Sequence, residues 1–249
     1  ISLKPGGFSF TIFAGKDHLL TYCDVMLGGD ETISAFSTDI KSLFADKHLS
    51  TFGYAEAEVV TLSDLASWLP EHLYEKGRER QYLSTIGKVR DGNTCFSDYN
   101  ALLKSYIVFA AESTAVSAFK ISFPGIKVRC QHSKLVVPEL VQQVRPSLLL
   151  NVREGACDIV ASSGGRLLLS NSYPSLAINE TLYKAINVMK TLSLENPDLT
   201  LWLCGNVDRE VYALMSRYFP NVRLYTGRTF TCKNDELRNI HTYKDVLIF

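Results

Sequence analysis

The sequence predicts an α/β protein with two related halves, each built of a mixed β-sheet flanked by helices. The first observation is that residues 1–26 and 147–173 both show three short strands joined by two tight turns. The second is that a helical pattern follows each of these units, with further strand-like and helical segments after it. The third is composition, because 46% of the 249 residues are apolar, which suffices for a large core.

The two strand units match in sequence when the chain is shifted by 148 residues, the interval between Gly7 and Gly155. The leucines that the same shift brings together are Leu19 with Leu167 and Leu20 with Leu168. Few residues are identical, so the order of the elements supports a duplication better than the identities do. We therefore predict two domains, at residues 1–145 and 146–249, the second ending in a polar C-terminal tail.

The first half shows period-two alternation or apolar runs wherever we predict a strand. These strands are expected at residues 8–13, 18–26, 57–62, 100–111 and 126–132. Helices are expected at residues 30–44, 63–70 and 113–124. Asp30 and Ser63 are the expected N-caps of the first two helices, and Pro70 should interrupt or end the second.

The second half begins after Pro146 with a very apolar run that suits a buried central strand. Strands are expected at residues 147–151, 156–161, 166–170, 199–204 and 222–225. Helices are expected at residues 140–144, 179–192 and 208–218. Asn179 and Asp208 are the expected N-caps of the last two helices. The last four residues are apolar and are expected to dock on the body of the protein.

Residues 75–92 form the most polar stretch, and we interpret its charge run, residues 75–81, as a solvated loop, with a partner-binding site as the alternative. Three glutamates recur at four-residue intervals in this region, at Glu71, Glu75 and Glu79. Their spacing is typical of a solvated helix face. Trp68 and Tyr74 nearby are expected to be packed inside rather than to form an exposed aromatic patch.

The charge balance disfavours nucleic acid as a partner, because 26 Lys and Arg residues match 26 Asp and Glu residues. A local basic site remains the alternative, and its residues would be Lys76, Arg78, Arg80 and Lys88. No apolar run approaches the ~20 residues that a membrane-spanning helix needs. The first residues have no signal-peptide pattern either.

The residues that usually carry catalysis or bind metals are scattered. The six cysteines lie at positions 23, 95, 130, 157, 204 and 232, without a CxxC pair. We interpret them as reduced, mostly buried thiols, which suits a cytoplasmic protein. The five histidines form no pairs at metal-ligand spacing, and Ser162 to Gly165 is interpreted as a turn. Asp158 is the only acid on the hairpin predicted for residues 156–170, too few for a two-metal nuclease. We therefore predict neither a cofactor nor a metal.

Two stretches carry a family resemblance, ISLKPGGFSFTIF at residues 1–13 and LLLNVREGACDIVASSGGRLLLSNSYP at residues 148–174. They resemble a bacterial (Bacteroidetes) family catalogued as domain of unknown function 3822. The resemblance covers nearly the whole chain and implies an actin-like ATPase fold, made of two ribonuclease-H-like domains. It also implies a bacterial cytoplasmic protein, and it brings no known activity.

In active members of the actin-like class, two hairpin turns clamp the nucleotide phosphates, and each begins with an Asp that orders Mg²⁺. Glycines in these turns let backbone N–H groups reach the phosphate oxygens. In the first turn of this chain, the Asp position falls on Leu3 or Lys4. Gly6 and Gly7 remain in that turn, but glycines are ordinary in hairpin turns.

The second turn and the adenosine-binding segment depart from the pattern as well. Asn151 occupies the Asp position of the second turn, Arg153 replaces a glycine, and Gly155 persists. The adenosine segment, which has a Gly pair in active members, reads Gly205-Asn206 here. Mg²⁺ prefers carboxylate oxygen, so the loss of both acids argues against Mg²⁺-dependent phosphoryl transfer.

The sequence therefore favours a non-catalytic scaffold or partner-binding protein with degenerate nucleotide-binding motifs and no catalytic residues. Its partner is expected to be another protein. The competing hypothesis is a nucleotide- or sugar-binding enzyme of the same superfamily that uses substitute residues. In that case Asn151, with Lys4 or Arg153, would meet an anion without a metal.

Overall fold

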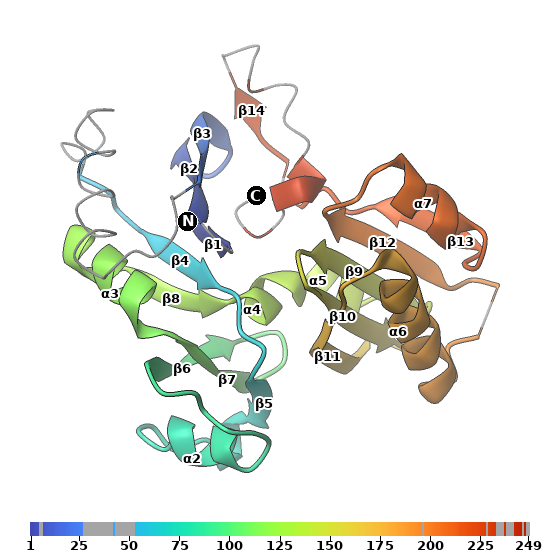
Figure 1. The fold of residues 1–249 in the computed structure, drawn as a ribbon, viewed down its shortest axis with the longest axis horizontal. Helices are drawn as coiled ribbons and strands as arrows, with labels where there is room; N and C mark the ends of the chain where they lie inside the picture. Colours follow the sequence, from blue (N-terminus) through green and yellow to red (C-terminus); the bar gives the residue numbers. More distant parts are fainter. Residues whose placement is uncertain are drawn as a thin grey trace. The chain divides into compact units, whose positions relative to one another are not determined.

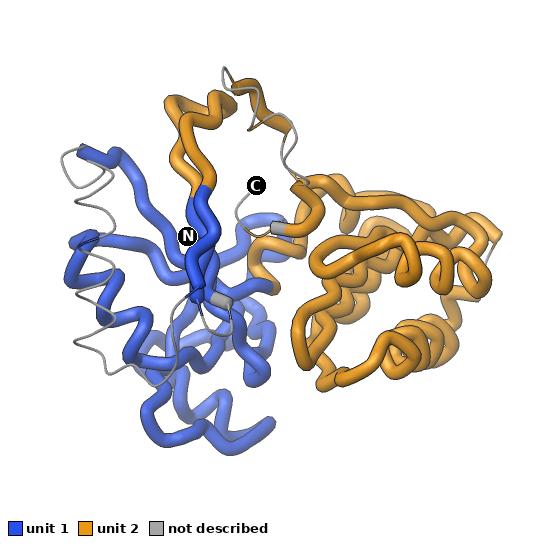
Figure 2. Tube along the Cα trace, turned by 45° about the horizontal axis from the view of Figure 1, so that its top comes forward, with its two compact units in different colours: residues 1–10, 23–131 blue, residues 11–22, 132–249 orange. Residues whose placement is uncertain are grey.

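The fold was determined as a computed structural model, shown in Figure 1, which describes residues 1–4, 7–26, 42, 53–195, 197–227, 229–232, 237, 242–245 and 247. The chain divides into two compact units (Figure 2). Unit 1 contains residues 1–10 and 23–131, and unit 2 contains residues 11–22 and 132–249. The predicted division between residues 145 and 146 stays a prediction. No helix among the described residues is long and apolar enough to cross a membrane.

The strands follow one another along the chain in three groups. Those of the first half are β1 (Ser2–Lys4), β2 (Gly7–Ala14), β3 (His18–Met26), β4 (Glu58–Thr61), β5 (Ala66–Pro70), β6 (Asn93–Asn100), β7 (Ser105–Glu112) and β8 (Lys127–Cys130). Those of the second half are β9 (Ser147–Arg153), β10 (Ala156–Ser163), β11 (Arg166–Pro174), β12 (Thr200–Gly205) and β13 (Asn221–Leu224). The tail adds β14 (Thr231–Cys232).

The helices are fewer and mostly short. They are η2 (Glu71–Leu73), α2 (Glu79–Ser84), α3 (Ser113–Ser122), α4 (Gln131–Leu135), α5 (Pro138–Val141), α6 (Ile178–Thr191), α7 (Arg209–Ser216) and η3 (Thr242–Asp245). The predicted helix at residues 30–44 and most of the tail after residue 228 lie outside the described residues.

Five strands of each large sheet follow the same order, which confirms a duplicated α/β fold. The first sheet runs β14-β3-β2-β1-β4-β8, and the second runs β11-β10-β9-β12-β13. In the second sheet β9 pairs antiparallel with β10 and parallel with β12. In the first sheet β1 makes the corresponding antiparallel pair with β2 and parallel pair with β4. Each half is therefore a three-strand meander extended by two parallel strands.

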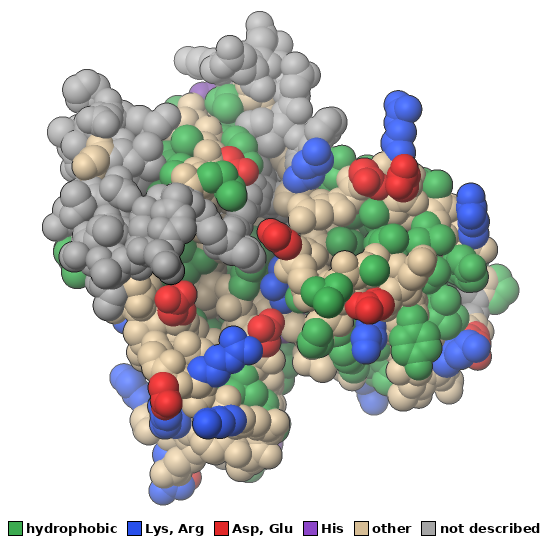
Figure 3. Space-filling view, in the orientation of Figure 1, with side chains coloured by type: hydrophobic (Ala, Val, Ile, Leu, Met, Phe, Trp, Pro, Cys, Tyr) green, Lys and Arg blue, Asp and Glu red, His purple; other side chains and the backbone are tan. Residues whose placement is uncertain are grey.

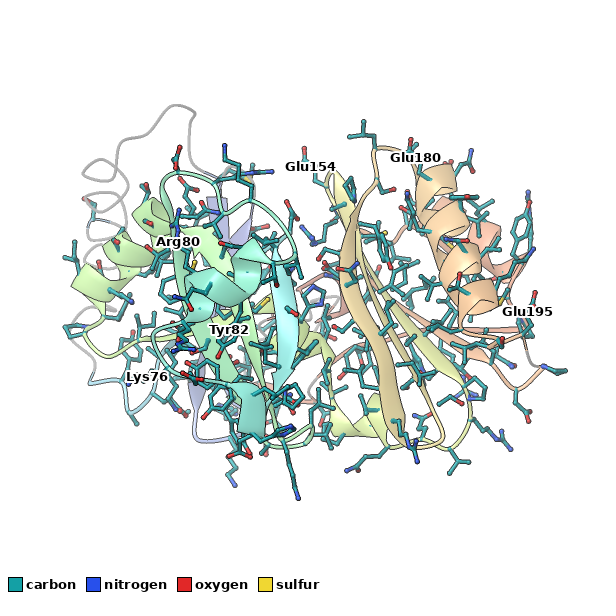
Figure 4. All side chains as sticks on the ribbon, turned by 90° about the horizontal axis from the view of Figure 1, so that it is seen from below. Lys76, Arg80, Tyr82, Glu154, Glu180 and Glu195 are labelled. Atoms are coloured by element: carbon teal, nitrogen blue, oxygen red, sulfur yellow. The ribbon has the colours of Figure 1, made fainter. Side chains whose placement is uncertain are left out.

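The core of unit 2 fills one face of the second sheet beneath α6 (Figure 4). The first six residues of β9 are buried, because this central strand is covered on both faces. Leu148 and Leu150 point to the α6 face and pack with Leu182 and Ala185 of that helix. The intervening residues Leu149 and Asn151 therefore belong to the opposite face, since side chains alternate along a strand.

A third sheet, with the strand order β5-β7-β6, is formed by the chain between β4 and β8 in unit 1. It differs from the elements that the sequence predicts for this region. The predicted helix at residues 63–70 is wrong, because Ala66–Pro70 pairs antiparallel with β7. Ser63 caps no helix; its N–H donates to Gln131 Oε1 at 2.9 Å, and its hydroxyl donates to the carbonyl of Ala110 at 2.7 Å. These partners lie 68 and 47 residues away along the chain. Tertiary hydrogen bonds thus replace the expected local cap.

Several other element predictions need adjustment. β6 was not predicted, and the expected loop at residues 75–81 overlaps the short helix α2. Asn179 is not a cap, because α6 begins one residue earlier, after Ala177. The capping role of Asp208 is confirmed, since its Oδ1 accepts from the Val211 N–H at 2.8 Å.

Candidate functional site

The hairpin between β9 and β10 contains the second of the two turns that the sequence predicts as degenerate phosphate-binding turns. Arg153 pairs with Ala156, so Glu154 and Gly155 alone form the connection. Gly155 has a φ of +70°, a left-handed conformation that glycine adopts without steric cost. The persistent glycine of this turn is therefore explained by the tight two-residue loop.

Asp158 lies at the centre of a buried polar cluster beside this hairpin. Its side chain is fully buried, and both of its oxygens accept hydrogen bonds. Arg153 donates from Nε to Oδ2 at 2.8 Å and from Nη2 to Oδ1 at 2.9 Å. Asn151 Nδ2 donates to Oδ2 at 2.9 Å, and the Ser172 hydroxyl donates to Oδ1 at 2.5 Å. A buried carboxylate needs such partners, and here four donors supply them.

His132 joins the same cluster from α4. Its Nε2 lies 3.0 Å from the hydroxyl of Ser172, and its Nδ1 lies 2.9 Å from the hydroxyl of Ser170. His132 is only 2% exposed. The hydroxyls of Ser172 and Ser170 are therefore hydrogen-bond partners of its two ring nitrogens inside the protein. We refer to Asn151, Arg153, Asp158, Ser172 and His132 as the Asp158 cluster.

The electrostatics of the Asp158 cluster favour an ionised carboxylate. Burial opposes ionisation and raises the pKa of Asp158, but the charge of Arg153, the influence of His132 and the hydrogen bonds from Arg153 and Ser172 outweigh it. The net result is a pKa below the usual value for Asp. The Arg153 side chain is only 12% exposed, and its guanidinium fork matches the carboxylate in a bidentate pair. Its charge is therefore neutralised within the sheet.

The structure brings two of the sequence-predicted segments together in unit 2. Strands β9 and β12 run in parallel, with Cys204 opposite Asn151 and Gly205 opposite Val152. A Cβ at Gly205 would lie 2.1 Å from the Val152 carbonyl oxygen and 2.6 Å from Asn151 Oδ1. The N–H of Asn206 donates to the same carbonyl of Val152 at 2.8 Å. Gly205 thus permits close approach of two backbones.

The residues predicted for the first turn belong to unit 1. Lys4 ends β1 opposite Gly7, the first residue of β2. A Cβ at Gly7 would lie 2.1 Å from the carbonyl oxygen of Val25, so this glycine also serves close backbone packing. Gly6 and the side chain of Lys4 lie outside the described residues.

The tip of the second turn carries an acid. Glu154 is exposed at the β9–β10 turn, and Glu180, near the start of α6, lies at the same end of unit 2 (Figure 4). The Glu180 carboxylate accepts a hydrogen bond from the N–H of Leu176 at 2.8 Å. An exposed carboxylate at the tip of the turn opposes an approaching phosphate through like-charge repulsion.

The buried thiols near the cluster are poor nucleophiles and poor metal ligands. Burial raises the pKa of Cys157 to about 11 and raises that of Cys204 well above its usual value. All six cysteines are free thiols. Within the described part of the chain, no group of three His, Cys, Asp or Glu side chains is placed to hold a metal ion.

Asn151 and Arg153 were predicted as site residues, but the side chains with which they form hydrogen bonds were not. Asp158 is the one charged residue within the apolar strand ACDIVA, and a lone acid in a buried strand requires a donor. That signal was available in the sequence. Ser172 and His132 gave no comparable signal, because their role depends on the pairing of β10 with β11 and on the position of α4.

Comparison with known proteins shows a match to one family model and a likeness to solved structures. The model of the family "Protein of unknown function (DUF3822)" matches residues 1–222. No match was found among curated proteins.

Two solved structures share the fold. The first is a protein from Bacteroides thetaiotaomicron with an actin-like ATPase fold and unknown function, at 17% identity and a TM-score of 0.76. The alignment covers 90% of this chain and 88% of that one. The second is the PilM-PilN type IV pilus biogenesis complex, at 12% identity and a TM-score of 0.64, covering 99% of this chain and 95% of that one.

Proposed function

The chain belongs to the DUF3822 family and has an actin-like ATPase fold, and we propose that it is a non-catalytic scaffold that binds a partner protein. One observation carries the proposal: the bidentate pair between Arg153 and Asp158, at 2.8 and 2.9 Å. In this pair the cation that stands in the second phosphate turn is already neutralised by a carboxylate of its own sheet.

The surroundings of the pair support the same proposal. Asn151, which stands at the position of the Mg²⁺-ordering Asp, donates its side-chain amide to Asp158. An amide that holds a buried carboxylate is not available to orient the waters of a metal ion. Glu154 adds a negative charge at the tip of the turn. The substitutions thus fit together as one structural cluster, which is what loss of a nucleotide site predicts.

The likeness to the PilM-PilN complex supports a protein as the partner, because in that structure the same architecture occurs in an assembly. Nucleic acid is less favoured, since Arg78 is paired with Glu75 at 3.1 Å. Acidic and basic side chains are also intermixed over the visible face (Figure 3). We also place the protein in the bacterial cytoplasm, where free thiols such as its six cysteines stay reduced.

A melting-temperature screen with ATP and ADP, each with and without Mg²⁺, tests the proposal. A ligand that binds only the folded state increases the free energy of unfolding, by about 2.7 kcal/mol at a ligand concentration of a hundred times Kd. This added stability raises the melting temperature. The proposed function predicts no Mg²⁺-dependent rise. A rise of several degrees that disappears in Asn151→Leu would instead support the competing enzyme hypothesis, provided that Asn187→Leu, at an exposed position of α6, keeps the rise.

A further inference from the structure

The two large sheets differ at one edge, beside the third strand of each half. In the first sheet β14 pairs in parallel with β3, with Thr231 opposite His18 and Cys232 opposite Leu19. In the second sheet β11 is the corresponding strand and pairs with β10. Across the part of the chain that the structure describes, no strand lies on the other side of β11 (Figure 1).

The strand on the first edge covers an apolar residue. Leu19 is 1% exposed and packs against Phe230, which immediately precedes β14. The ring of Phe230 also meets that of Phe13 edge-on, with centroids 6.4 Å apart. An extended segment thus adds to this edge through its backbone and anchors itself with one aromatic side chain.

The second edge has the same leucines without the cover. The 148-residue shift places Leu167 at the position of Leu19 and Leu168 at that of Leu20. Leu167 is half-buried instead of fully buried, and Leu168 is 42% exposed. β11 carries a charged residue and a proline at its ends, Arg166 and Pro174. Its pairing with β10 also shifts register once, since Ser162 pairs with Leu167 and Ala161 with Leu169, which leaves Leu168 without a partner on β10.

We propose that the start of β11, residues 166–169, is the docking site for an extended segment of a partner protein. The segment adds to the edge in parallel, as β14 does on β3, and places an aromatic or large aliphatic side chain over Leu167. Backbone hydrogen bonds supply the affinity and the apolar anchor supplies the selectivity. The later part of β11 is not included in the docking site, because the hydroxyls of Ser170 and Ser172 form hydrogen bonds with His132 there.

This inference rests on the proposed function, since it names the kind of partner that the scaffold binds. A second copy of the chain fits the edge less well. Two β11 strands related by a two-fold axis pair antiparallel, whereas the strand that this chain already holds on the equivalent edge is parallel.

The test selects a linear-peptide display library against the full chain and uses the enriched peptide as the probe. Leu168→Lys places a charge in the docking edge, next to the residue over which the anchor packs, and should weaken binding by about tenfold or more. The matched control is Leu20→Lys, at the equivalent and similarly exposed position of β3, which should leave binding unchanged. Equal melting temperatures show that both variants are folded.

Amide hydrogen exchange gives a readout that needs no variant. The peptide should slow exchange at residues 166–169 and leave residues 18–22 unchanged. The inference is overturned if no peptide is enriched, if Leu168→Lys binds as the unsubstituted chain does, or if protection falls elsewhere. A concentration-dependent dimer that Leu168→Lys abolishes would also overturn it, by assigning the edge to a second copy. These outcomes are independent of the nucleotide screen, which tests the proposed function separately.

Discussion

Arg153 and Asp158 form a bidentate ion pair across the first hairpin of the second sheet, with N–O distances of 2.8 and 2.9 Å. The pair joins two adjacent strands, beside the turn that the sequence predicts as a degenerate phosphate turn. Removing one partner leaves the other charge buried and unpaired. We expect Asp158→Asn to cost about 3–5 kcal/mol of unfolding free energy, and Arg153→Met a similar amount.

Urea unfolding of both single variants and of the double variant measures this coupling. The double variant should recover part of the loss, because it leaves no unpaired charge. Additive losses in the double variant would contradict a direct pair.

The same carboxylate predicts a dependence of stability on pH. Folding lowers the pKa of Asp158 below the unfolded value of about 3.9. Such a group contributes its stability in full above the unfolded pKa and loses it as pH falls through the folded pKa. The difference in unfolding free energy between the unsubstituted chain and Asp158→Asn should therefore stay constant from about pH 7 to 5 and shrink below about pH 4. Urea titrations over this range test it; a difference that instead grows on acidification would refute the assignment.

The two glycines near the turn should respond differently to alanine. Both have positive φ, +82° at Gly205 and +70° at Gly155, but only Gly205 lacks room for a Cβ. We expect Gly155→Ala to cost about 1–2 kcal/mol from backbone strain alone. Gly205→Ala should cost about 2–5 kcal/mol, because the clash with the Val152 carbonyl adds to the strain. Thermal unfolding of the two variants checks the order, and equal losses would argue against the close approach of β9 and β12.

Thiol labelling should separate the cysteines by burial. Cys157 and Cys204 have raised pKa values because they are buried, so few thiolates form near neutral pH. We expect a maleimide at pH 8 to label Cys23 and Cys232, which are partly exposed, and to reach Cys157 and Cys204 only after denaturation. Peptide mapping after labelling reads this directly. Early modification of Cys204 in the folded chain would mean that the sheet opens near Asn151.

The corner between β4 and β5 offers a test of how unit 1 is closed. Gln131 accepts from the Ser63 N–H at 2.9 Å and donates to the Ser63 carbonyl at 2.7 Å, in a buried environment. Gln131→Glu keeps the acceptor, loses the donor and adds a buried charge, so it should cost about 2–4 kcal/mol. Gln81→Glu, an exposed change on α2, is the control and should stay within about 0.5 kcal/mol of the unsubstituted chain. Equal stability of the two variants would contradict the buried amide clamp.

Local signals in the sequence were enough for the parts of the fold that are held locally. The meander of β1, β2 and β3 follows from period-two alternation and from the glycines between the strands. The start of α7 follows from Asp208, whose side chain meets an N–H three residues ahead. The order of elements was also sufficient to predict the duplication.

Long-range partners explain the elements that the sequence did not predict. Ser63 looked like a helix cap, but its hydrogen bonds run to Gln131 and Ala110, and the chain after it pairs with β7 as a strand. Arg153 looked like a substitute anion ligand, and nothing near it in sequence except Asp158 indicated its pairing. Ser172 and His132 enter that cluster from β11 and α4, so their roles depend on tertiary structure.

The most direct test of the account is a crystal structure of the full chain grown with ATP and Mg²⁺ and inspected at Asn151, Arg153 and Gly155. We expect that Arg153 still holds Asp158 in the bidentate pair and that no nucleotide phosphate occupies the turn. A phosphate with an ordered divalent ion at Gly155, and Arg153 turned away from Asp158, would contradict it.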